Sequence, residues 1–299
     1  MKHYLFFLCF FSLSHTVFAV DDNHIPVTEV IPKATIALVG GTFVNDEIFN
    51  RDLIKSKFTI PTDVGTSPTI YYAEYKNTPF YYVHSHGHDW LPTWAALYDL
   101  GVKEVIGGAT AGAINREMKV YDYVVADDFI DLNVDRALRI PNEVYHDPDS
   151  IVIPRFMPPM DDDLRQILLT NTQKALKDKS WDVHDNGVIV QTKGGRFETA
   201  AEVKMIEIMG GDLVTMSVAT EIIYARLLGI NYACLIVISN PAEGIAPWDF
   251  GLMKELYPQI NPVSLDIFLD SLTDIAAIGD KPRSIDGQVI HPEMTSKKQ

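Results

Sequence analysis

The stretch from residue 194 to residue 245 constrains this chain more than any other, because it places versatile side chains at the ends of alternating segments. It contains three such clusters, at residues 194–199 (GGRFET), 216–217 (MS) and 239–244 (SNPAEG). Helix-like stretches separate the clusters, and an apolar run leads into the last one. Open α/β sheets assemble small-molecule sites in this way, at the ends of their strands.

The rest of the chain follows the same alternation of strand-like and helix-like segments. Strand-like segments are predicted at residues 35–39, 69–74, 80–84, 104–106, 121–126, 188–191 and 232–238. Helix-like segments are predicted at residues 91–100, 161–177, 200–209, 220–228 and 265–277. This alternation predicts an α/β fold, a single domain with a mainly parallel central sheet flanked by helices.

The clusters resemble, in one collinear order, the purine nucleoside phosphorylase and methylthioadenosine phosphorylase family of the trimeric type. Residues 194–202 match Gly-Pro-x-Phe-Glu-Thr-x-x-Glu, with Gly195 in place of proline. Residues 215–221 match Gly-Met-Ser/Thr-x-x-Pro-Glu, with Thr220 in place of proline, and residues 240–245 match Asn-x-Ala-Ala-Gly-Ile, with Glu243 for one alanine. Weaker matches at residues 39–42, 109–115 and 123–131 extend the resemblance upstream to residue 34.

This resemblance implies a nucleoside phosphorylase-like fold and an enzyme of the pentosyltransferase class. The implied reaction is phosphorolysis of a purine nucleoside, or of its 5′-methylthio analogue, to the free base and a pentose 1-phosphate. Inorganic phosphate is then the co-substrate, with no further cofactor, and a homotrimer is expected. Two alternatives stay open, a hydrolytic purine nucleosidase and a nucleoside-binding protein without turnover whose phosphate site is degenerate.

By this resemblance, four residues hold the nucleoside. Asn240 is the catalytic candidate, because a carboxamide both donates and accepts hydrogen bonds and can bridge the edge of the leaving purine. Phe197 is expected to stack on the base, Glu198 to accept from its far edge, and Met216 to lie under the sugar. The structural alternatives are a turn asparagine before proline, an acid that starts a helix, and a core methionine.

The expected phosphate ligands are Thr42, Thr110 and Ser217, since hydroxyls and backbone amides at strand-to-helix turns suit phosphate. The chain departs from the family at residues 83–88 (VHSHGH), where the family carries an arginine. His84 or Ser85 takes the position of that arginine, and His86 keeps the position of the family's histidine, a second catalytic candidate. Phosphate binding is expected to be weak unless Arg51 or Lys55 compensates.

The histidines at residues 84, 86 and 88 have the alternating spacing of metal ligands on a strand. A His-rich tract alone is only a compositional indication of metal binding, and we expect no metal site here. Arg196 either reaches the pocket or pairs with surface acids.

The N-terminus has the pattern of a secretory signal peptide over residues 1–19, with residues 20–299 forming the domain and a secreted or periplasmic location. Only Cys234 would remain after cleavage, which excludes a disulfide within one subunit. With 40 acidic residues against 25 basic ones, the net charge is -15. Such a surface disfavours nucleic acid and anionic membranes as partners and leaves purine nucleoside and phosphate as the expected ones.

Overall fold

The computed structural model describes residues 17–19, 27–29, 31–44, 47–86, 89–133, 153–279, 281–286 and 289–290. The chain divides into two compact units, residues 1–32 and residues 33–299. In the first unit, β1 (Val17–Ala19) pairs antiparallel with β2 (Val27–Glu29). The predicted signal peptide otherwise lies outside the described residues, so its boundary at residue 19 stays a prediction.

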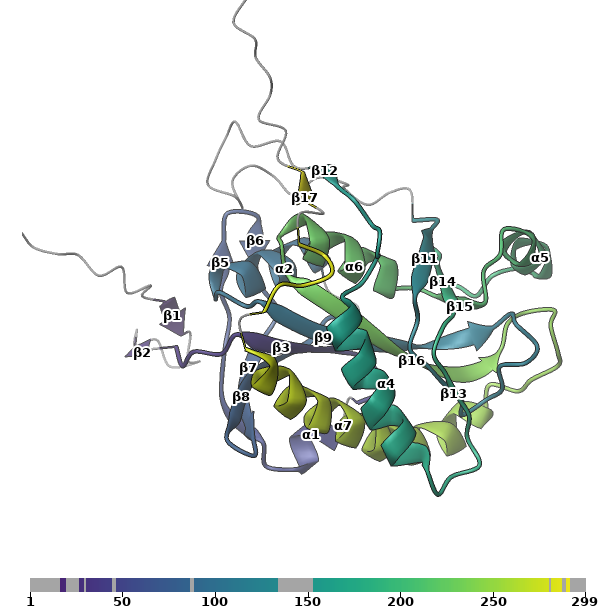
Figure 1. The fold of residues 1–299 in the computed structure, drawn as a ribbon, viewed down its shortest axis with the longest axis horizontal. Coiled ribbons are helices and arrows are strands. Elements are labelled where there is room, and N and C mark those ends of the chain that lie inside the picture. Colours follow the sequence, from purple (N-terminus) through teal and green to yellow (C-terminus); the bar gives the residue numbers. More distant parts are fainter. Residues whose placement is uncertain are drawn as a thin grey trace, which may run out of the picture. The chain divides into compact units, whose positions relative to one another are not determined.

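The second unit is built on a mixed, mostly parallel sheet, which confirms the predicted fold class (Figure 1). Its main path runs β11-β14-β15-β9-β3-β8-β7-β4, while β16 pairs with β9 and β10, and β10 with β13. The strands are β3 (Ile36–Gly40), β4 (Ile54–Phe58), β7 (Ile70–Tyr75), β8 (Thr78–His84), β9 (Glu104–Ala113), β10 (Tyr123–Val124), β11 (Asp128–Asp131), β13 (Val183–His184), β14 (Val188–Gln191), β15 (Leu213–Thr215) and β16 (Asn231–Pro241). Two small ribbons pair β5 (Pro61–Thr62) with β6 (Gly65–Thr66) and β12 (Ile153–Pro154) with β17 (Val289–Ile290).

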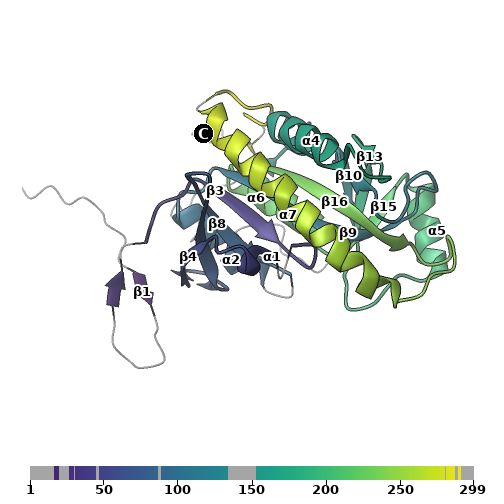
Figure 2. The ribbon, with the colours of Figure 1, turned by 90° about the horizontal axis from the view of Figure 1, so that it is seen from below.

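Helices pack on both faces of this sheet (Figure 2). The described helices are α1 (Glu47–Asn50), α2 (Trp90–Asp99), α4 (Asp162–Leu176), α5 (Ala200–Ile208), α6 (Val218–Leu227) and α7 (Leu252–Ile278). Alternate residues of β16 explain the two layers, since successive side chains of a strand point to opposite faces. Leu235 joins the cluster that α4 and α7 supply, whereas Tyr232 contacts Glu221 of α6.

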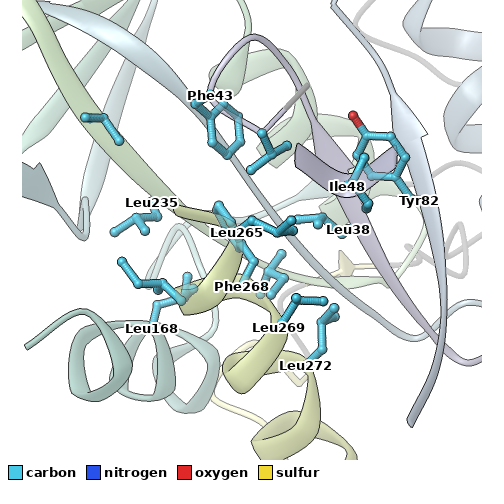
Figure 3. Packing of buried hydrophobic residues seen from close by; sticks show 14 of the residues in the cluster. Leu38, Phe43, Ile48, Tyr82, Leu168, Leu235, Leu265, Phe268, Leu269 and Leu272 are labelled. Carbon is cyan, nitrogen blue, oxygen red and sulfur yellow. The ribbon is translucent and has the colours of Figure 1, made fainter. Parts of the chain in front are cut away.

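A large core cluster lies between the sheet and the pair α4 and α7 (Figure 3). Phe43 and Phe268 meet there with ring centroids 5.4 Å apart, and Leu168 and Leu265 are fully buried. Burying an aliphatic side chain of this size contributes about 1.5–3 kcal/mol, so this face of the sheet is a rigid platform. The loops at the strand ends are anchored to it.

Most predicted elements are present near their predicted positions. The hairpin of β7 and β8 is confirmed, and its turn at Lys76 and Asn77 has φ of 48° and 64°, as a type I′ turn requires. The helix predicted to stop at Gly101 ends there as α2, where that glycine takes φ 78°.

Two predicted boundaries are wrong. The final helix, predicted over residues 265–277, begins at Leu252. The prediction failed because Pro258 and Pro262, which normally break helices, lie inside α7. A proline inside a helix costs about 3 kcal/mol, and here the buried Leu256 and Ile260 in the same turns offset that cost. Strand β9, predicted to stop at residue 106, continues through its glycines to Ala113.

Candidate active site

A pocket of about 490 Å³ is lined by the carboxyl-terminal parts of β9, β15 and β16 and by the segments that follow β3, β8, β14 and β15. Parallel strands present their following loops at one edge, which is where open α/β sheets bind ligands. The described residues that line it include eight of the sequence-predicted site residues: Thr42, His86, Thr110, Phe197, Glu198, Met216, Ser217 and Asn240. Segments that are far apart in the sequence thus meet around one cavity.

Asn240 lies within β16 rather than in a turn, and its side chain is buried. The register of β16 against β9 shifts between Ile238 and Asn240, a bulge that re-aims the side chain toward the pocket. Its Oδ1 accepts from Ser239 Oγ at 2.7 Å, and its Nδ2 donates to the Pro241 carbonyl at 2.9 Å. These two contacts fix the orientation of the amide group. Oδ1 can still accept one more hydrogen bond, and Nδ2 can still donate one more.

The loop after β14 carries the aromatic and acidic candidates. Gly194 and Gly195 take φ of 83° and 79°, which proline cannot adopt, so the glycine in place of the family's proline gives this loop its shape. Phe197 lies beyond them, 46% exposed at the pocket wall. An aromatic face in this position is available to a planar ligand.

Glu198 is buried and does not cap the helix that follows. Its Oε1 accepts from Thr192 Oγ1 at 2.6 Å. The amides at the start of α5 are satisfied by a capping box between Thr199 and Glu202. Glu198 therefore lines the pocket, and it does not cap α5, which was the structural alternative for this residue.

Three hydroxyl residues lie on the pocket wall toward β3, β9 and α6. Thr42 follows β3, Thr110 lies in β9, and Ser217 is the N-cap residue of α6 but makes no side-chain capping bond. Helix α6 thus begins at the pocket, and its first turn carries the positive end of the helix dipole. Thr220, where the family has proline, uses its backbone N–H to donate to Gln191 Oε1 at 2.7 Å, which ties α6 to β14.

His86 extends into the pocket from the loop after β8 and lies directly over Gly41. A Cβ on Gly41 would lie 2.1 Å from the His86 Nδ1 atom, so only glycine fits there. On its other side, Nε2 lies 3.9 Å from Oε1 of Glu221, a fully buried carboxyl of α6. Burial, with a smaller contribution from the neighbouring His84, lowers the pKa of His86 to about 4.

The positions proposed to replace the arginine are otherwise engaged. His84 is not among the residues that line the pocket, and Ser85 is buried with its hydroxyl donating to Glu221 at 3.2 Å. Arg51 pairs with Glu47 and Asp266, and Lys55 donates to the carbonyl of Asp52. No arginine is thus placed in the pocket from this part of the described chain.

Arg196 pairs with a surface acid. Its guanidinium contacts both carboxylate oxygens of Glu202, at 2.7 and 2.8 Å, and contributes to a smaller neighbouring pocket. The larger pocket has lining residues that the sequence did not single out as ligands: Trp90, Lys193, Glu243, Phe250, Met253 and Tyr257. The i, i+4 spacing of Met253 and Tyr257 is a helical signal that Pro258 obscured.

An aromatic cluster, formed by Phe197, Trp248 and Phe250, lies at the rim of the pocket. Phe197 meets Trp248 edge-on at 5.6 Å and Phe250 at 6.4 Å between ring centroids. Such edge contacts favour a fixed orientation of the Phe197 ring.

Within the described residues, no group of three His, Cys, Asp or Glu side chains is arranged to hold a metal ion. His88, the third histidine of the alternating run, lies outside the described residues. In the same described part of the chain, no helix combines the length and the apolar character that crossing a membrane requires.

Comparison with known proteins places this geometry in context. Residues 59–268 match the phosphorylase superfamily. The chain is 33% identical to the 6-oxopurine nucleoside phosphorylase of Pyrococcus furiosus over 222 residues, covering 71% of this chain and 81% of that protein. It is 30% identical to a probable S-methyl-5′-thioinosine phosphorylase of Methanothermobacter thermautotrophicus over 222 residues, covering 71% and 73%. A methylthioadenosine phosphorylase structure from Schistosoma mansoni in complex with adenine shares the fold, with a TM-score of 0.71 and 20% identity over 82% of this chain and 92% of that one.

Proposed function

This chain belongs to the phosphorylase superfamily, and from that premise we propose that it is a pentosyltransferase that cleaves purine nucleosides by phosphorolysis. The products are the free purine and a pentose 1-phosphate. One observation carries the proposal: a single pocket holds both a purine-type wall, with Phe197, Glu198 and Asn240, and an oxyanion-type wall, with Thr42, Thr110 and Ser217. Inorganic phosphate is the proposed co-substrate, with no cofactor.

The proposed chemistry follows from where charge develops. As the bond between sugar C1′ and purine N9 breaks, the sugar becomes oxocarbenium-like and electrons move into the purine. Asn240 stabilises that charge, because its Nδ2 donates and its Oδ1 accepts at the purine edge. A phosphate oxygen then forms the new bond to C1′, the proton of the hydrogen phosphate passes to the purine, and the sugar leaves as its phosphate ester.

The proposed bases are 6-oxopurines. An asparagine can donate to a 6-oxo group and accept from a protonated N7, and its orientation here is held by Ser239 and Pro241. Two of the relatives are a 6-oxopurine nucleoside phosphorylase and a probable methylthioinosine phosphorylase, so both 5′-hydroxyl and 5′-methylthio sugars are candidate substrates.

Hydrolysis is the second candidate, and one observation favours it. The pocket offers few cations to bind phosphate. Lys193 is the one lysine or arginine among the described residues that line it, and the family's arginine is absent from residues 83–88. Product analysis on inosine, adenosine and methylthioadenosine, with and without phosphate, tests both. Base release that requires phosphate supports phosphorolysis, whereas equal release without phosphate supports the nucleosidase.

Two further proposals concern the state of the protein. By family resemblance we propose a homotrimer, which light scattering after gel filtration tests. From the N-terminal sequence pattern we propose export to a secreted or periplasmic location, with cleavage after residue 19. Mass spectrometry of the mature N-terminus tests it, and an intact Met1 in the purified native protein would contradict it.

A further inference from the structure

We propose that Glu221 is a positioning residue that holds His86 as an imidazolium when an oxyanion occupies the pocket, so that the pair does the work of the missing arginine. This inference rests on the proposed function, in which an oxyanion binds beside His86. It concerns a carboxyl group that does not itself line the pocket.

The position of Glu221 is tightly constrained. Tyr232 donates to its Oε2 at 2.6 Å, and Ser85 donates to its Oε1 at 3.2 Å. The backbone of β9 closes the remaining side, since a Cβ on Gly107 would lie 2.6 Å from the Tyr232 hydroxyl and 2.9 Å from Glu221 Oε2. The indole of Trp90 also approaches this carboxyl, and its Oε1 faces His86 Nε2 at 3.9 Å.

The imidazole of His86 bridges this carboxyl and the predicted oxyanion wall. Its Nδ1 edge lies over Gly41, beside Thr42, and its Nε2 faces Glu221 Oε1 at 3.9 Å. The Nε2 atom is buried and has no hydrogen-bond partner among the described residues. A neutral imidazole can donate from one nitrogen only, so donating to both sides requires the imidazolium.

Both groups favour their neutral forms while the pocket is empty. Burial raises the pKa of Glu221 to about 7, and burial lowers the pKa of His86 to about 4. Between these values the pair carries one proton, which resides on Glu221. A bound oxyanion reverses the preference: the Oε1–H bond of Glu221 breaks, the Nε2–H bond of His86 forms, and no other proton enters or leaves.

Other titratable groups face the pair from β16 and β8. Tyr232 and Cys234 face Glu221 from β16, and burial raises the pKa of each. His84 faces His86 from β8, with ring centroids 6.3 Å apart. No described lysine or arginine forms a salt bridge with Glu221 or His86. The proton on Glu221 is therefore available to His86 without any change of protonation at Tyr232 or Cys234.

The test uses sulfate, a dianion that keeps its charge from about pH 5 to pH 9. In the wild-type protein, sulfate affinity should be flat up to about pH 7 and then fall by up to about tenfold per pH unit, because the pair must take its proton from solvent. Calorimetry in buffers of different ionisation enthalpy should show about one proton taken up per sulfate at about pH 8, and close to none at about pH 6.

The Glu221→Gln variant keeps the shape of the side chain and an oxygen for Tyr232. It should lose the break near pH 7 and raise the KM for phosphate about tenfold or more, with little change in the KM for nucleoside. In a His86→Asn background the same change should have almost no further effect on phosphate, because the two residues act as one unit.

Asp122→Asn is the matched control. Asp122 is another buried carboxylate beside a histidine, 3.0 Å from Nε2 of His184, but it lies outside the pocket. It should leave sulfate affinity and its pH profile unchanged even where it lowers thermal stability. The control separates a general loss of packing from a specific loss at the oxyanion wall.

The inference is overturned if Glu221→Gln keeps the wild-type pH break and phosphate KM, or if its effect is undiminished in the His86→Asn background. Equal losses in phosphate KM and nucleoside KM would also overturn it, as a purely structural role predicts. Failure of the proposed function looks different. Base release independent of phosphate, together with intact proton-linked sulfate binding, would reject phosphorolysis and leave the role of Glu221 standing.

Discussion

Replacing Asn240 with alanine should reduce turnover far more than it reduces stability. The side chain makes two hydrogen bonds, and only the Pro241 carbonyl loses its donor, because Ser239 Oγ lies 3.2 Å from the carbonyl oxygen of Ala111 as an alternative acceptor. A buried acceptor left without a partner costs about 1–3 kcal/mol of unfolding free energy, and the partly buried Pro241 carbonyl costs no more than that. Losing a donor that acts in the transition state lowers the rate by about 10²–10³, or about 2.7–4 kcal/mol.

The assay is kcat for inosine at saturating phosphate, alongside urea denaturation of the same preparations. Ser239→Ala is the matched variant, because it removes the hydroxyl that orients Asn240 and leaves the carboxamide in place. We expect a smaller loss of kcat from Ser239→Ala, with a comparable change in stability. Wild-type kcat in Asn240→Ala would refute the assignment of the leaving-group residue.

Four further predictions concern other contacts of the pocket and one further change at Asn240. Asn240→Asp should shift preference from inosine toward adenosine in competition assays, because a carboxylate accepts from a 6-amino group and repels a 6-oxo group; an unchanged ratio would contradict this. Phe197→Ala should raise the KM for nucleoside by the equivalent of about 1–3 kcal/mol of stacking, leaving the KM for phosphate unaltered. Gly41→Ala should weaken phosphate binding in titrations, because its Cβ would displace the His86 ring from 2.1 Å away. Glu221→Gln should make the unfolding free energy rise more steeply between about pH 4 and pH 7 than it does in the wild type. The folded pKa of Glu221 is raised to about 7, so its contribution to stability is lost as pH rises, whereas the pKa of His86 is lowered to about 4 and its contribution has the opposite sign. Denaturation across this pH range would contradict the reasoning if the two proteins showed the same slope.

The order of elements could be predicted from the sequence because each carries a local signal. Gly101 ends α2, and the acidic cluster that begins with Asp161 starts α4. The start of α7 could not be predicted, since Pro258 and Pro262 are local helix breakers that tertiary packing overrides. The full length of β9 could not be predicted either, because glycines usually signal a turn. Here they permit close approach of β9 to β16: a Cβ on Gly108 would lie 2.0 Å from the Leu235 carbonyl oxygen.

The site residues that belong to a sequence motif could be predicted, whereas those that only the fold brings to the pocket could not. Phe197, Glu198 and Asn240 belong to such motifs and meet in one pocket. The contribution of Tyr257 depends on the early start of α7. The approach of Glu221 to His86 depends on how α6 packs against the loop after β8, a contact over a long sequence separation that no local pattern encodes.

Phosphorus NMR of a complete reaction with inosine tests the central claim most directly. We predict that the inorganic phosphate signal is replaced by a pentose 1-phosphate signal, with one ester formed per hypoxanthine released, and that omitting phosphate stops base release. Full release of hypoxanthine with no loss of inorganic phosphate, and with free pentose as the sugar product, would contradict the account.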